Sequence, residues 1–482
     1  MNKFSALQEV QEQLSRSEIT VSKVVDHFLG QIESNNQRIN AFVEVYTESA
    51  KAKALEVDQK VEAGNAGKLA GLVISIKDNI CYQGHGVSAS SKMLENFESL
   101  YSSTVVERLL TEDAIIIGRT NCDEFAMGSS NETSYYGAVK NPLDIQKVAG
   151  GSSGGAAAAL AAGMCMASLG SDTGGSIRQP ASFTGVIGLK PTYGRVSRHG
   201  LIAFGSSFDQ IGTFTNSIED AASIMEVISG KDEYDSTLSQ KAVPAYTERL
   251  KKEDKKTKKI AYFDCYVEHE GIDEAVRKKT LEVIDALKKD GHQVDKIPFD
   301  YLDQMVPTYY VLTTAEASSN LARYDGIHFG YRSEQATDLE STYVLSRSEG
   351  FGREVKRRIM LGTYVLSAGY YDAYYTKAQK VRRIVKEKTN DVLEEYDFVI
   401  SPTSPHTAFD LKAQTNDQIK MYLEDIFTVQ ANLAGVPAVS LPIGKNEENM
   451  PFGIQLMAKA FDEENLLSFS NTLMNKFVLK KD

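Results

Sequence analysis

The sequence has few of the residues that build disulfide frameworks or metal sites. Its 482 residues include only four cysteines and seven histidines. The cysteines, Cys81, Cys122, Cys165 and Cys265, lie far apart and form no CxxC pair, which argues for a reducing compartment and against a disulfide framework. The histidines form no HxH or HExxH spacing, so the sequence predicts no zinc site.

Long apolar runs are also missing. No window approaches the ~18 apolar residues that a membrane-spanning helix needs. Residues 2–20 are polar and amphipathic, with neither the apolar core of a signal peptide nor the arginine-rich character of a transit peptide. We therefore expect a soluble cytoplasmic protein.

Positive charge is in deficit. Lysine and arginine total 53, against 65 aspartate and glutamate residues, which gives a formal net charge of −12. Because phosphate binding needs basic stripes, this balance argues against extensive direct contact with nucleic acid. Apolar residues make up 42% of the chain, and its length suits one large α/β domain or two to three ordinary ones.

Helical and strand-like stretches alternate along the chain. Residues 4–62 carry helical periodicity, and residues 69–80 include a short β-branched run that predicts a buried strand ending at Lys77. Residues 103–121 indicate a helix followed by a strand, and further strand-like runs precede a final amphipathic helix from about residue 463. Such alternation predicts an α/β fold, with a sheet covered by helices.

No internal repeat or linker divides the chain. The sequence therefore predicts a single domain over residues 1–482, with a helical N-terminal arm over residues 1–65. The middle segment, residues 230–395, is richer in charge and tyrosine and is able to form a helical cap within that domain. Residues 352–396 predict one or two long helices.

A Gly/Ser segment runs directly into an alanine-rich helix, since residues 149–163 are AGGSSGGAAAALAAG. The segment lacks the Lys-Ser/Thr of a P-loop and the G-x-G-x-x-G spacing of a dinucleotide site, so it predicts no phosphate cradle. One interpretation is a loop that caps the helix. The other is a loop whose backbone and hydroxyl groups are aimed at a substrate.

A second Gly-rich turn, GSDTGGS at residues 170–176, ends at Ser176. Because glycine takes positive φ without steric cost, Gly174 and Gly175 allow successive N–H groups to turn toward one point. Such a nest holds an anion, or the oxyanion that forms when a carbonyl is attacked, and a serine at its edge is placed as a nucleophile. Taken alone, Gly-Gly-Ser is more often an ordinary turn.

A serine nucleophile needs a base, and no histidine lies in a suitable setting. No G-x-S-x-G elbow surrounds Ser176 either. The alternative base is a lysine made neutral by burial, and Lys77, at the end of the apolar run LVISIK, suits that role. The competing interpretation is a lysine that leaves the sheet edge for water, which is more usual for a single lysine.

Together these segments resemble a known family. GGSSGGAAAALAAG at 150–163, followed by GSDTGGSIRQPASFTGVIGLKPTYGRVSRHG at 170–200, resembles the signature of the amidase signature family, and ISIKDN at 74–79 supplies the upstream lysine. The resemblance implies a single large domain with a central twisted mixed sheet covered by helices on both faces. Four further stretches resemble the glutaminase branch of that family: 118–134, 316–332, 369–383 and 432–442.

By position, the family's triad falls on Lys77 as the general base, Ser152 as the proton bridge and Ser176 as the acyl-forming nucleophile. A neutral lysine bonded to one hydroxyl, which accepts from the next, lets a proton pass without histidine. The resemblance also implies a cis peptide bond before Ser152. It implies an oxyanion hole made by backbone N–H groups of the second turn, those of Thr173, Gly174, Gly175 and Ser176.

For the substrate, the resemblance implies glutamine, hydrolysed to ammonia through a glutamyl ester of Ser176. The α-ammonium and α-carboxylate of glutamine need one acidic and one basic partner. The positions that match the family's pocket are Asp425 for the ammonium, Arg358 for the carboxylate, and Tyr309 and Ser129 alongside. Arg357 and Tyr310, each one position away, stay open as alternatives. Taken alone, an Asp or Arg on a helix is more often solvated or salt-bridged.

The resemblance implies that the chain is one component of a tRNA-dependent amidotransferase, a heterotrimer with B and C subunits. The chain itself would hold no cofactor, because ATP and Mg²⁺ are expected in the partner subunit. That partner would also hold the misacylated tRNA, Glu-tRNA(Gln) or Asp-tRNA(Asn), and the acidic balance of this chain agrees. Two rival hypotheses are a free-standing amidase acting on another small or fatty amide, and a non-catalytic scaffold that uses its Gly-rich loops only as turns.

Overall fold

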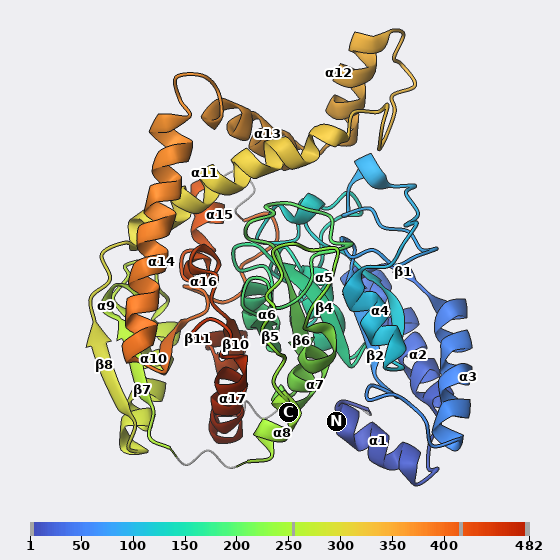
Figure 1. The fold of residues 1–482 in the computed structure, drawn as a ribbon, viewed down its shortest axis with the longest axis vertical. Helices are drawn as coiled ribbons and strands as arrows, with labels where there is room; N and C mark the ends of the chain where they lie inside the picture. Colours follow the sequence, from blue (N-terminus) through green and yellow to red (C-terminus); the bar gives the residue numbers. More distant parts are fainter. Residues whose placement is uncertain (1–3, 253–255, 414–417, 478–482) are drawn as a thin grey trace.

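The computed structural model describes residues 4–252, 256–413 and 418–477, and a large mixed sheet runs through them (Figure 1). The sheet has eleven strands in the order β1-β3-β2-β4-β6-β5-β10-β11-β9-β7-β8. β2 is parallel to β3 and β4, whereas β10 is antiparallel to β5 and β11. The predicted α/β fold is confirmed. The strands are β1 (Phe42–Val45), β2 (Val73–Lys77), β3 (Ile115–Thr120), β4 (Ala167–Asp172), β5 (Ile187–Lys190), β6 (Gln210–Thr215), β7 (Lys259–Phe263), β8 (Gln293–Ile297), β9 (Phe398–Pro402), β10 (Ala438–Lys445) and β11 (Pro451–Ala458).

Helices cover both faces of this sheet. α5 and α6 pack together against one face, and α4, α7 and α17 form a layer on the other (Figure 1). Every residue of β2, β3, β4 and β6 is buried, as expected for strands covered on both sides. Within the three described ranges, no helix combines the length and the apolar character needed to cross a membrane. The α-helices are α1 (Leu7–Ser15), α2 (Val21–Ile39), α3 (Thr47–Glu62), α4 (Thr104–Thr111), α5 (Gly154–Ala161), α6 (Arg178–Thr184), α7 (Ile218–Ile228), α8 (Tyr246–Leu250), α9 (Asp264–Val267), α10 (Glu274–Lys289), α11 (Leu302–Asn320), α12 (Leu339–Gly350), α13 (Arg353–Val365), α14 (Lys377–Glu395), α15 (Gln418–Leu423), α16 (Val429–Ala434) and α17 (Glu463–Phe477).

The strand β2 determines where the site lies. It is fully buried and ends at Lys77, as the sequence predicts. Because β2 and β4 run parallel, with Ile76 opposite Leu169, their carboxyl ends meet at the same edge of the sheet. β4 continues to Asp172, so Lys77 and the Gly-rich turn after β4 emerge side by side. The carboxyl ends of strands are where ligands bind in many open α/β sheets.

The N-terminal arm contains one element that its helical periodicity does not predict. The helices α1, α2 and α3 occupy most of residues 1–65, but β1 lies between α2 and α3. β1 pairs antiparallel with β3 and forms one edge of the sheet. Asn40, just after α2, takes a left-handed conformation with φ of 62°, which turns the chain back toward the sheet. A strand of 4 residues between two long helices is too short to show its own periodicity.

The middle segment, residues 230–395, is not a purely helical cap. β7 and β8 pair in parallel and extend the sheet beyond β9. The helices α11 to α14 follow, with α12 and α13 above the sheet in Figure 1. Residues 352–396 form the two helices α13 and α14, which are separated by a π-helical turn at Asp372–Thr376. The two short strands are embedded in charged sequence, so composition alone assigns this segment to helices.

Candidate active site

Lys77 ends β2 inside the protein. Its side chain has no exposed surface, and its Nζ atom contacts three hydroxyls, Ser152 Oγ at 2.8 Å, Ser153 Oγ at 2.9 Å and Ser171 Oγ at 2.9 Å. Burial lowers the pKa of Lys77 to about 8, although nearby acidic groups, Cys122 first among them, oppose the shift. The interpretation of a solvated lysine at the sheet edge is therefore wrong, and a buried amine close to neutrality takes its place.

The partners of Lys77 suit both protonation states of its amine. An ammonium donates three hydrogen bonds, and three hydroxyl oxygens are present to accept them. When the amine loses its proton, a hydroxyl can rotate and donate to the nitrogen lone pair. Asn79 Nδ2 donates to Ser171 Oγ at 3.0 Å, and Ser153 Oγ donates to the Ser171 carbonyl at 3.0 Å, so the hydroxyls are held in place. This arrangement can hand over a proton without a histidine.

The Gly/Ser segment before α5 is pressed against two polar side chains, and its Gly151–Ser152 peptide bond is cis. A Cβ atom on Gly150 would lie 2.5 Å from Gln179 Oε1, and one on Gly151 would overlap Asp123 Oδ2. The Gly151 N–H donates to Gln179 Oε1 at 3.0 Å. Since no side chain fits at either position, the glycines permit a close approach of backbone to side chain. The segment is thus a fixed part of the site and more than a helix cap.

The second Gly-rich turn connects β4 to α6 and brings Ser176 to the same place. The Ser153 N–H donates to the Ser176 carbonyl oxygen at 3.2 Å, and Ser176 is 7% exposed. Among the contacts of the described residues, no hydrogen bond joins the Ser152 and Ser176 hydroxyls. The structure therefore brings Lys77 directly to Ser152, and it brings Ser176 beside them through the backbone.

The backbone of this turn is closely packed and leaves its N–H groups available. Gly175 has a φ of 145°, which L-residues rarely adopt, and a Cβ atom there would overlap Thr428 Oγ1. A Cβ atom on Gly174 would lie 2.6 Å from Cζ of Tyr309. Within the described part of the chain, the N–H groups of residues 173–176 meet no protein acceptor. Unpaired N–H groups beside a serine can stabilise an oxyanion.

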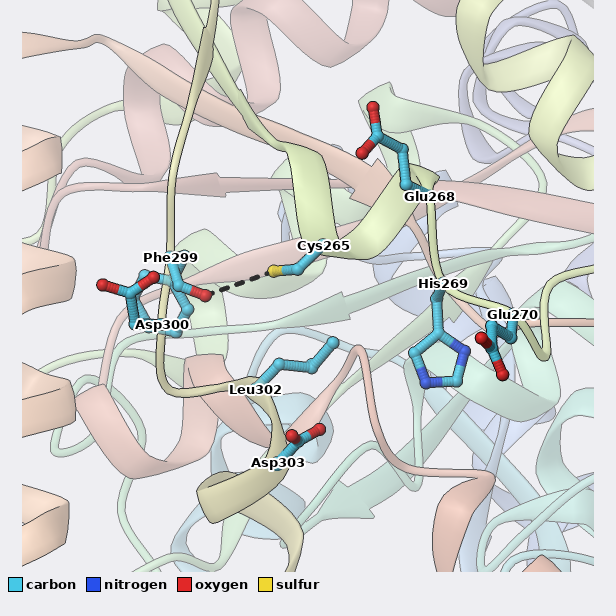
Figure 2. Close-up of a pocket in the computed structure, with 8 residues that line it drawn as sticks. All are labelled: Cys265, Glu268, His269, Glu270, Phe299, Asp300, Leu302 and Asp303. Carbon is cyan, nitrogen blue, oxygen red and sulfur yellow. Dashed lines mark hydrogen bonds between the residues drawn. The ribbon is translucent and has the colours of Figure 1, made fainter.

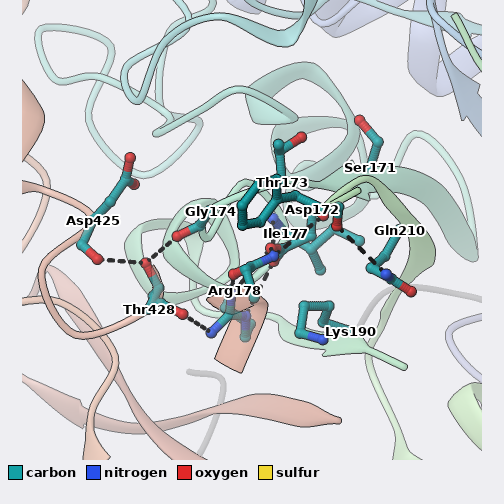
Figure 3. Close-up of polar contacts among 12 residues, drawn as sticks. Ser171, Asp172, Thr173, Gly174, Ile177, Arg178, Lys190, Gln210, Asp425 and Thr428 are labelled. Carbon is teal, nitrogen blue, oxygen red and sulfur yellow. Dashed lines mark hydrogen bonds and ion pairs between the residues drawn. The ribbon is translucent and has the colours of Figure 1, made fainter. Parts of the chain in front are cut away.

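A buried ion pair anchors the turn at both ends (Figure 3). Arg178 Nε and Nη2 bind the two carboxylate oxygens of Asp172 at 3.1 and 3.0 Å, and neither residue is exposed. Burial raises the pKa of Asp172, but the Arg178 guanidinium, together with Lys190 and Asn432, keeps that pKa below its ordinary value. Arg178 also donates to the Thr428 carbonyl at 2.8 Å and to Asn432 Oδ1 at 2.6 Å. The turn is thereby tied to the segment that enters α16.

Asp425 lies in the same region, and among the described residues its carboxylate has one hydrogen-bond partner. Its Oδ2 accepts a hydrogen bond from Ser129 Oγ at 3.1 Å, and Asp425 is 5% exposed. Burial raises the pKa of Asp425 to about 8, although Ser129 and the charge of Arg358 oppose the shift. A buried carboxylate that titrates near neutrality would be stabilised in its ionised form by a cationic ligand group.

Arg358 is the buried member of the arginine pair on α13. Its side chain is 3% exposed, against 32% for Arg357. Its Nε donates to Glu354 Oε1 at 2.8 Å, and its guanidinium lies 5.1 Å from the ring centre of Tyr310. Arg357 donates to the other Glu354 oxygen, Oε2, at 2.5 Å. Of the two alternatives left open by the sequence, only Arg358 lies in the interior.

Tyr309 and Tyr310 of α11 both lie close to the residues described above. The Tyr309 ring packs directly against Gly174 of the turn, because a Cβ atom added at Gly174 would lie only 2.6 Å from Tyr309 Cζ. The Tyr310 ring stacks on Tyr422, with ring centres 4.0 Å apart, and faces Arg358. The structure therefore gives the two neighbours different contacts, Tyr309 with the turn and Tyr310 with the arginine.

A cavity lies elsewhere in the described part of the chain (Figure 2). It has a volume of about 620 Å³, half of its lining residues are acidic, and none of the site residues predicted from the sequence is part of it. Its thiol, Cys265, is not a reactive thiolate, because burial and neighbouring carboxylates raise the pKa of that thiol to about 12. In the described ranges, no group of three or more His, Cys, Asp or Glu residues is arranged to hold a metal ion. The lining residues are Cys265, Glu268, His269, Glu270, Phe299, Asp300, Leu302 and Asp303.

Comparison with known proteins agrees with this geometry. A family model described as Amidase matches residues 23–467. The chain belongs to the amidase family. The A subunit of glutamyl-tRNA(Gln) amidotransferase from Fusobacterium nucleatum is 51% identical over 469 residues, which cover 97% of this chain and 96% of that protein. The protein of the same name from Chlorobium limicola is 47% identical, covering 98% of this chain and all of its own length (100%). A solved structure of the protein of that name from Thermotoga maritima is 38% identical, with a TM-score of 0.77, and covers 95% of this chain and 94% of that one.

In this member of the amidase family, two partners of the central lysine were not predicted from the sequence. Ser153 directly follows Ser152, and both hydroxyls reach Lys77. Ser171 reaches Lys77 only because β2 and β4 are parallel neighbours in the sheet. Ser171 lies in the second Gly-rich segment, residues 170–176, but strand order, which brings it to Lys77, is not visible in one sequence.

Proposed function

We propose that this chain is the glutaminase component of a tRNA-dependent amidotransferase. It hydrolyses glutamine and supplies ammonia for converting Glu-tRNA(Gln) to Gln-tRNA(Gln), or Asp-tRNA(Asn) to Asn-tRNA(Asn). The observation that carries the proposal is Lys77, a buried amine with a pKa lowered by burial to about 8 and bonded to Ser152. The name shared by its relatives, the A subunit of glutamyl-tRNA(Gln) amidotransferase, supports the choice of substrate and the role within a complex.

The reaction begins when Ser176 Oγ attacks the side-chain carbonyl carbon of glutamine. As the C–O bond forms, the Ser176 proton passes to Ser152, whose own proton passes to the neutral amine of Lys77. This step requires the Ser152 and Ser176 hydroxyls to come within hydrogen-bond distance of each other. The lysine ammonium then returns a proton through the same hydroxyls to the leaving nitrogen, the C–N bond breaks, and ammonia departs. Water attacks the glutamyl ester through the same relay and restores Ser176.

The turn after β4 would stabilise the negative charge that develops on the carbonyl oxygen. Its N–H groups are free of protein acceptors in the described contacts, which supports this role. The donors of the oxyanion hole are the N–H groups of Thr173, Gly174, Gly175 and Ser176.

Buried groups of opposite charge would hold the two ends of glutamine. Asp425, assisted by Ser129, would bind the α-ammonium, which would keep that carboxylate ionised despite its raised pKa. Arg358 would bind the α-carboxylate, since its Nε is engaged by Glu354 while its outer nitrogens make no described hydrogen bond. Tyr309 would pack alongside the substrate between the turn and α11.

We propose that B and C subunits complete a cytoplasmic heterotrimer. ATP and Mg²⁺ belong to the partner subunit, and this chain holds no cofactor of its own. The misacylated tRNA contacts mainly that partner, in keeping with the net charge of −12. We take residues 1–482 as one domain, because the sheet draws strands from both halves of the chain, from β1 to β11.

Ser176→Ala tests this function in the assembled complex. The variant should lose transfer from glutamine and retain transfer from added ammonium, because only the ammonia source is removed. Amide formation on charged tRNA is measured with each nitrogen donor. Loss of both activities would contradict the division between ammonia source and ammonia acceptor. Efficient hydrolysis of unrelated amides by the isolated chain would instead favour a free-standing amidase.

A further inference from the structure

A threonine that contacts the ion pair also holds the Gly-rich turn (Figure 3). Thr428 Oγ1 lies 2.6 Å from the carbonyl oxygen of Gly174 and 3.1 Å from that of Asp425. A hydroxyl has one proton to donate, and the Asp425 carbonyl already accepts the N–H groups of Thr428 and Val429, each at 3.0 Å. The Thr428 proton therefore goes to Gly174, the shorter of the two contacts.

This hydrogen bond fixes more than one carbonyl, because a peptide group is planar. In a trans peptide, the C=O of Gly174 and the N–H of Gly175 point in opposite directions within one plane. Holding the carbonyl against Thr428 therefore directs the Gly175 N–H away from Thr428. Neither glycine has a Cβ atom, so the two residues themselves offer little resistance to a flip of this plane. The orientation of the N–H group depends on the threonine.

Packing and hydrogen bonds hold Thr428 itself in place. Thr428 is fully buried, and a Cβ atom on Gly175 would overlap its Oγ1, so its side chain packs directly on the turn. Its carbonyl accepts Arg178 Nη1 at 2.8 Å, and the same guanidinium binds Asp172 at the start of the turn. The hydroxyl of Thr428 is thus held at a set distance from the turn by an ion pair that has no exposed surface.

We propose that Thr428 is a positioning residue for the reaction of Ser176. Its hydroxyl locks the Gly174–Gly175 peptide so that the Gly175 N–H faces the developing oxyanion. Asp425 and Thr428 lie in one backbone turn, in which the Thr428 N–H donates to the Asp425 carbonyl. The carboxylate for the substrate ammonium and the hydroxyl that holds the Gly174–Gly175 peptide are therefore part of the same turn. The glutamine part of this inference rests on the proposed function. The oxyanion part applies to any amide that Ser176 attacks.

The test compares two substitutions at this position in the assembled complex. Thr428→Val keeps the branched shape and removes the hydroxyl, whereas Thr428→Ser keeps the hydroxyl. Thr280→Val is the matched control, because Thr280 is equally buried and its hydroxyl donates to the Val276 carbonyl at 2.8 Å on the distant helix α10. Hydrolysis is measured with glutamine and with the neutral amide propionamide. The kcat is expressed per active site, counted by trapping the acyl-enzyme, so that a partly misfolded sample does not alter it.

Thr428→Val should lower kcat for both amides by about 10–100-fold, somewhat less than the ~10²–10³-fold loss for removal of a direct oxyanion donor. Thr428→Ser should restore kcat to within about threefold, and the KM for glutamine should change less than kcat, since differential stabilisation of the transition state is lost. An unchanged kcat in Thr428→Val overturns the proposal. So does a loss that serine does not reverse, or one confined to the number of active sites. If glutamine is not hydrolysed by any form but propionamide shows the expected series, the glutamine function fails and the role of Thr428 stands.

Discussion

Lys77 and Lys190 are both fully buried, and the comparison shows what makes a buried lysine a base. Lys77 contacts three hydroxyls, whereas Lys190 donates to two backbone carbonyls, Pro191 at 2.8 Å and Val436 at 2.6 Å. Burial lowers the pKa of Lys77 to about 8 and that of Lys190 to about 7, with the charge of Arg178 adding to the second shift. By pKa alone, either lysine could serve as the base.

The hydrogen-bond partners separate the two lysines. A carbonyl oxygen only accepts, so it cannot donate to the lone pair of a neutral amine. Around Lys190, a neutral amine has two carbonyl acceptors and no hydroxyl among its contacts from which its lone pair could take a proton. The hydroxyls around Lys77 serve the ammonium and the neutral amine equally well. We therefore propose that Lys190 has a structural role, joining the end of β5 to the loop before β10, and that Lys77 has the chemical one.

Removing the amine of Lys77 should have the largest effect. Lys77→Met is expected to lower kcat for glutamine by about 10³-fold or more, in the upper range for loss of a general base. The fold should persist, because methionine fills the space without a buried polar amine. Glutamine hydrolysis by the complex measures the loss, and transfer from added ammonium serves as the control. A variant that keeps a tenth of the wild-type rate would exclude Lys77 as the base.

The pH dependence should follow the same amine. Lys77 must be neutral to accept a proton, so kcat for glutamine should rise about tenfold per pH unit below its pKa of about 8 and level off above it. Transfer from added ammonium, recorded over the same range, separates this rise from any titration of the partner subunit. A flat kcat profile through this range would show that Lys77 does not change its charge in the rate-limiting step.

A smaller effect is expected when one hydroxyl around Lys77 is removed. Ser171→Ala takes away one acceptor of the ammonium, so kcat should fall about 10- to 150-fold, which corresponds to the ~1.5–3 kcal/mol of a hydrogen bond to a charged group. The midpoint of the pH profile should move to lower pH, because the ammonium form loses a partner. Ser168→Ala is the matched control on the same strand, since Ser168 is buried and bonds to Ser75 at 2.7 Å. If the midpoint of the pH profile moves equally in both variants, Ser171 has no specific effect on the Lys77 ammonium, which would contradict this prediction.

Lys190 should affect stability and leave the rate almost unchanged. Lys190→Met is expected to keep kcat within about twofold and to lower the free energy of unfolding by about 1–3 kcal/mol, because two buried carbonyls lose their donor. The folded pKa of about 7 lies below the 10.5 of the unfolded chain, so the unfolded state binds more protons between these values. The advantage of wild type over the variant should therefore grow as pH rises from about 7 to 10.5. Urea unfolding at several pH values measures it, and an advantage that shrinks with rising pH would contradict the assignment.

The fold was predictable where periodicity is strong. The strand that ends at Lys77, the helix and strand at 103–121 and the terminal helix all follow from the pattern of apolar residues. β1, β7 and β8 were not predicted, because strands of 4 or 5 residues carry too few alternations among neighbouring helices and charged residues.

The candidate site divides in the same way. Lys77, Ser152 and Ser176 lie in segments whose composition is unusual, so the sequence singles them out. Ser171 and Thr428 come to the site through strand order and through a contact between distant segments, which one sequence does not encode locally. Arg357 and Arg358 could not be separated either, because adjacent residues on a helix differ only by its rotation, and burial by the neighbouring tyrosines decides between them.

In the proposed mechanism, Ser176 carries the glutamyl group while Lys77 takes its proton through Ser152. The most direct measurement is to quench the complex with acid during glutamine turnover and to locate the ester by mass spectrometry. Wild type should carry the glutamyl group on Ser176, and the Lys77→Met complex should carry none. An ester on Ser152 or Ser153, or equal ester in the Lys77→Met complex, would contradict the account.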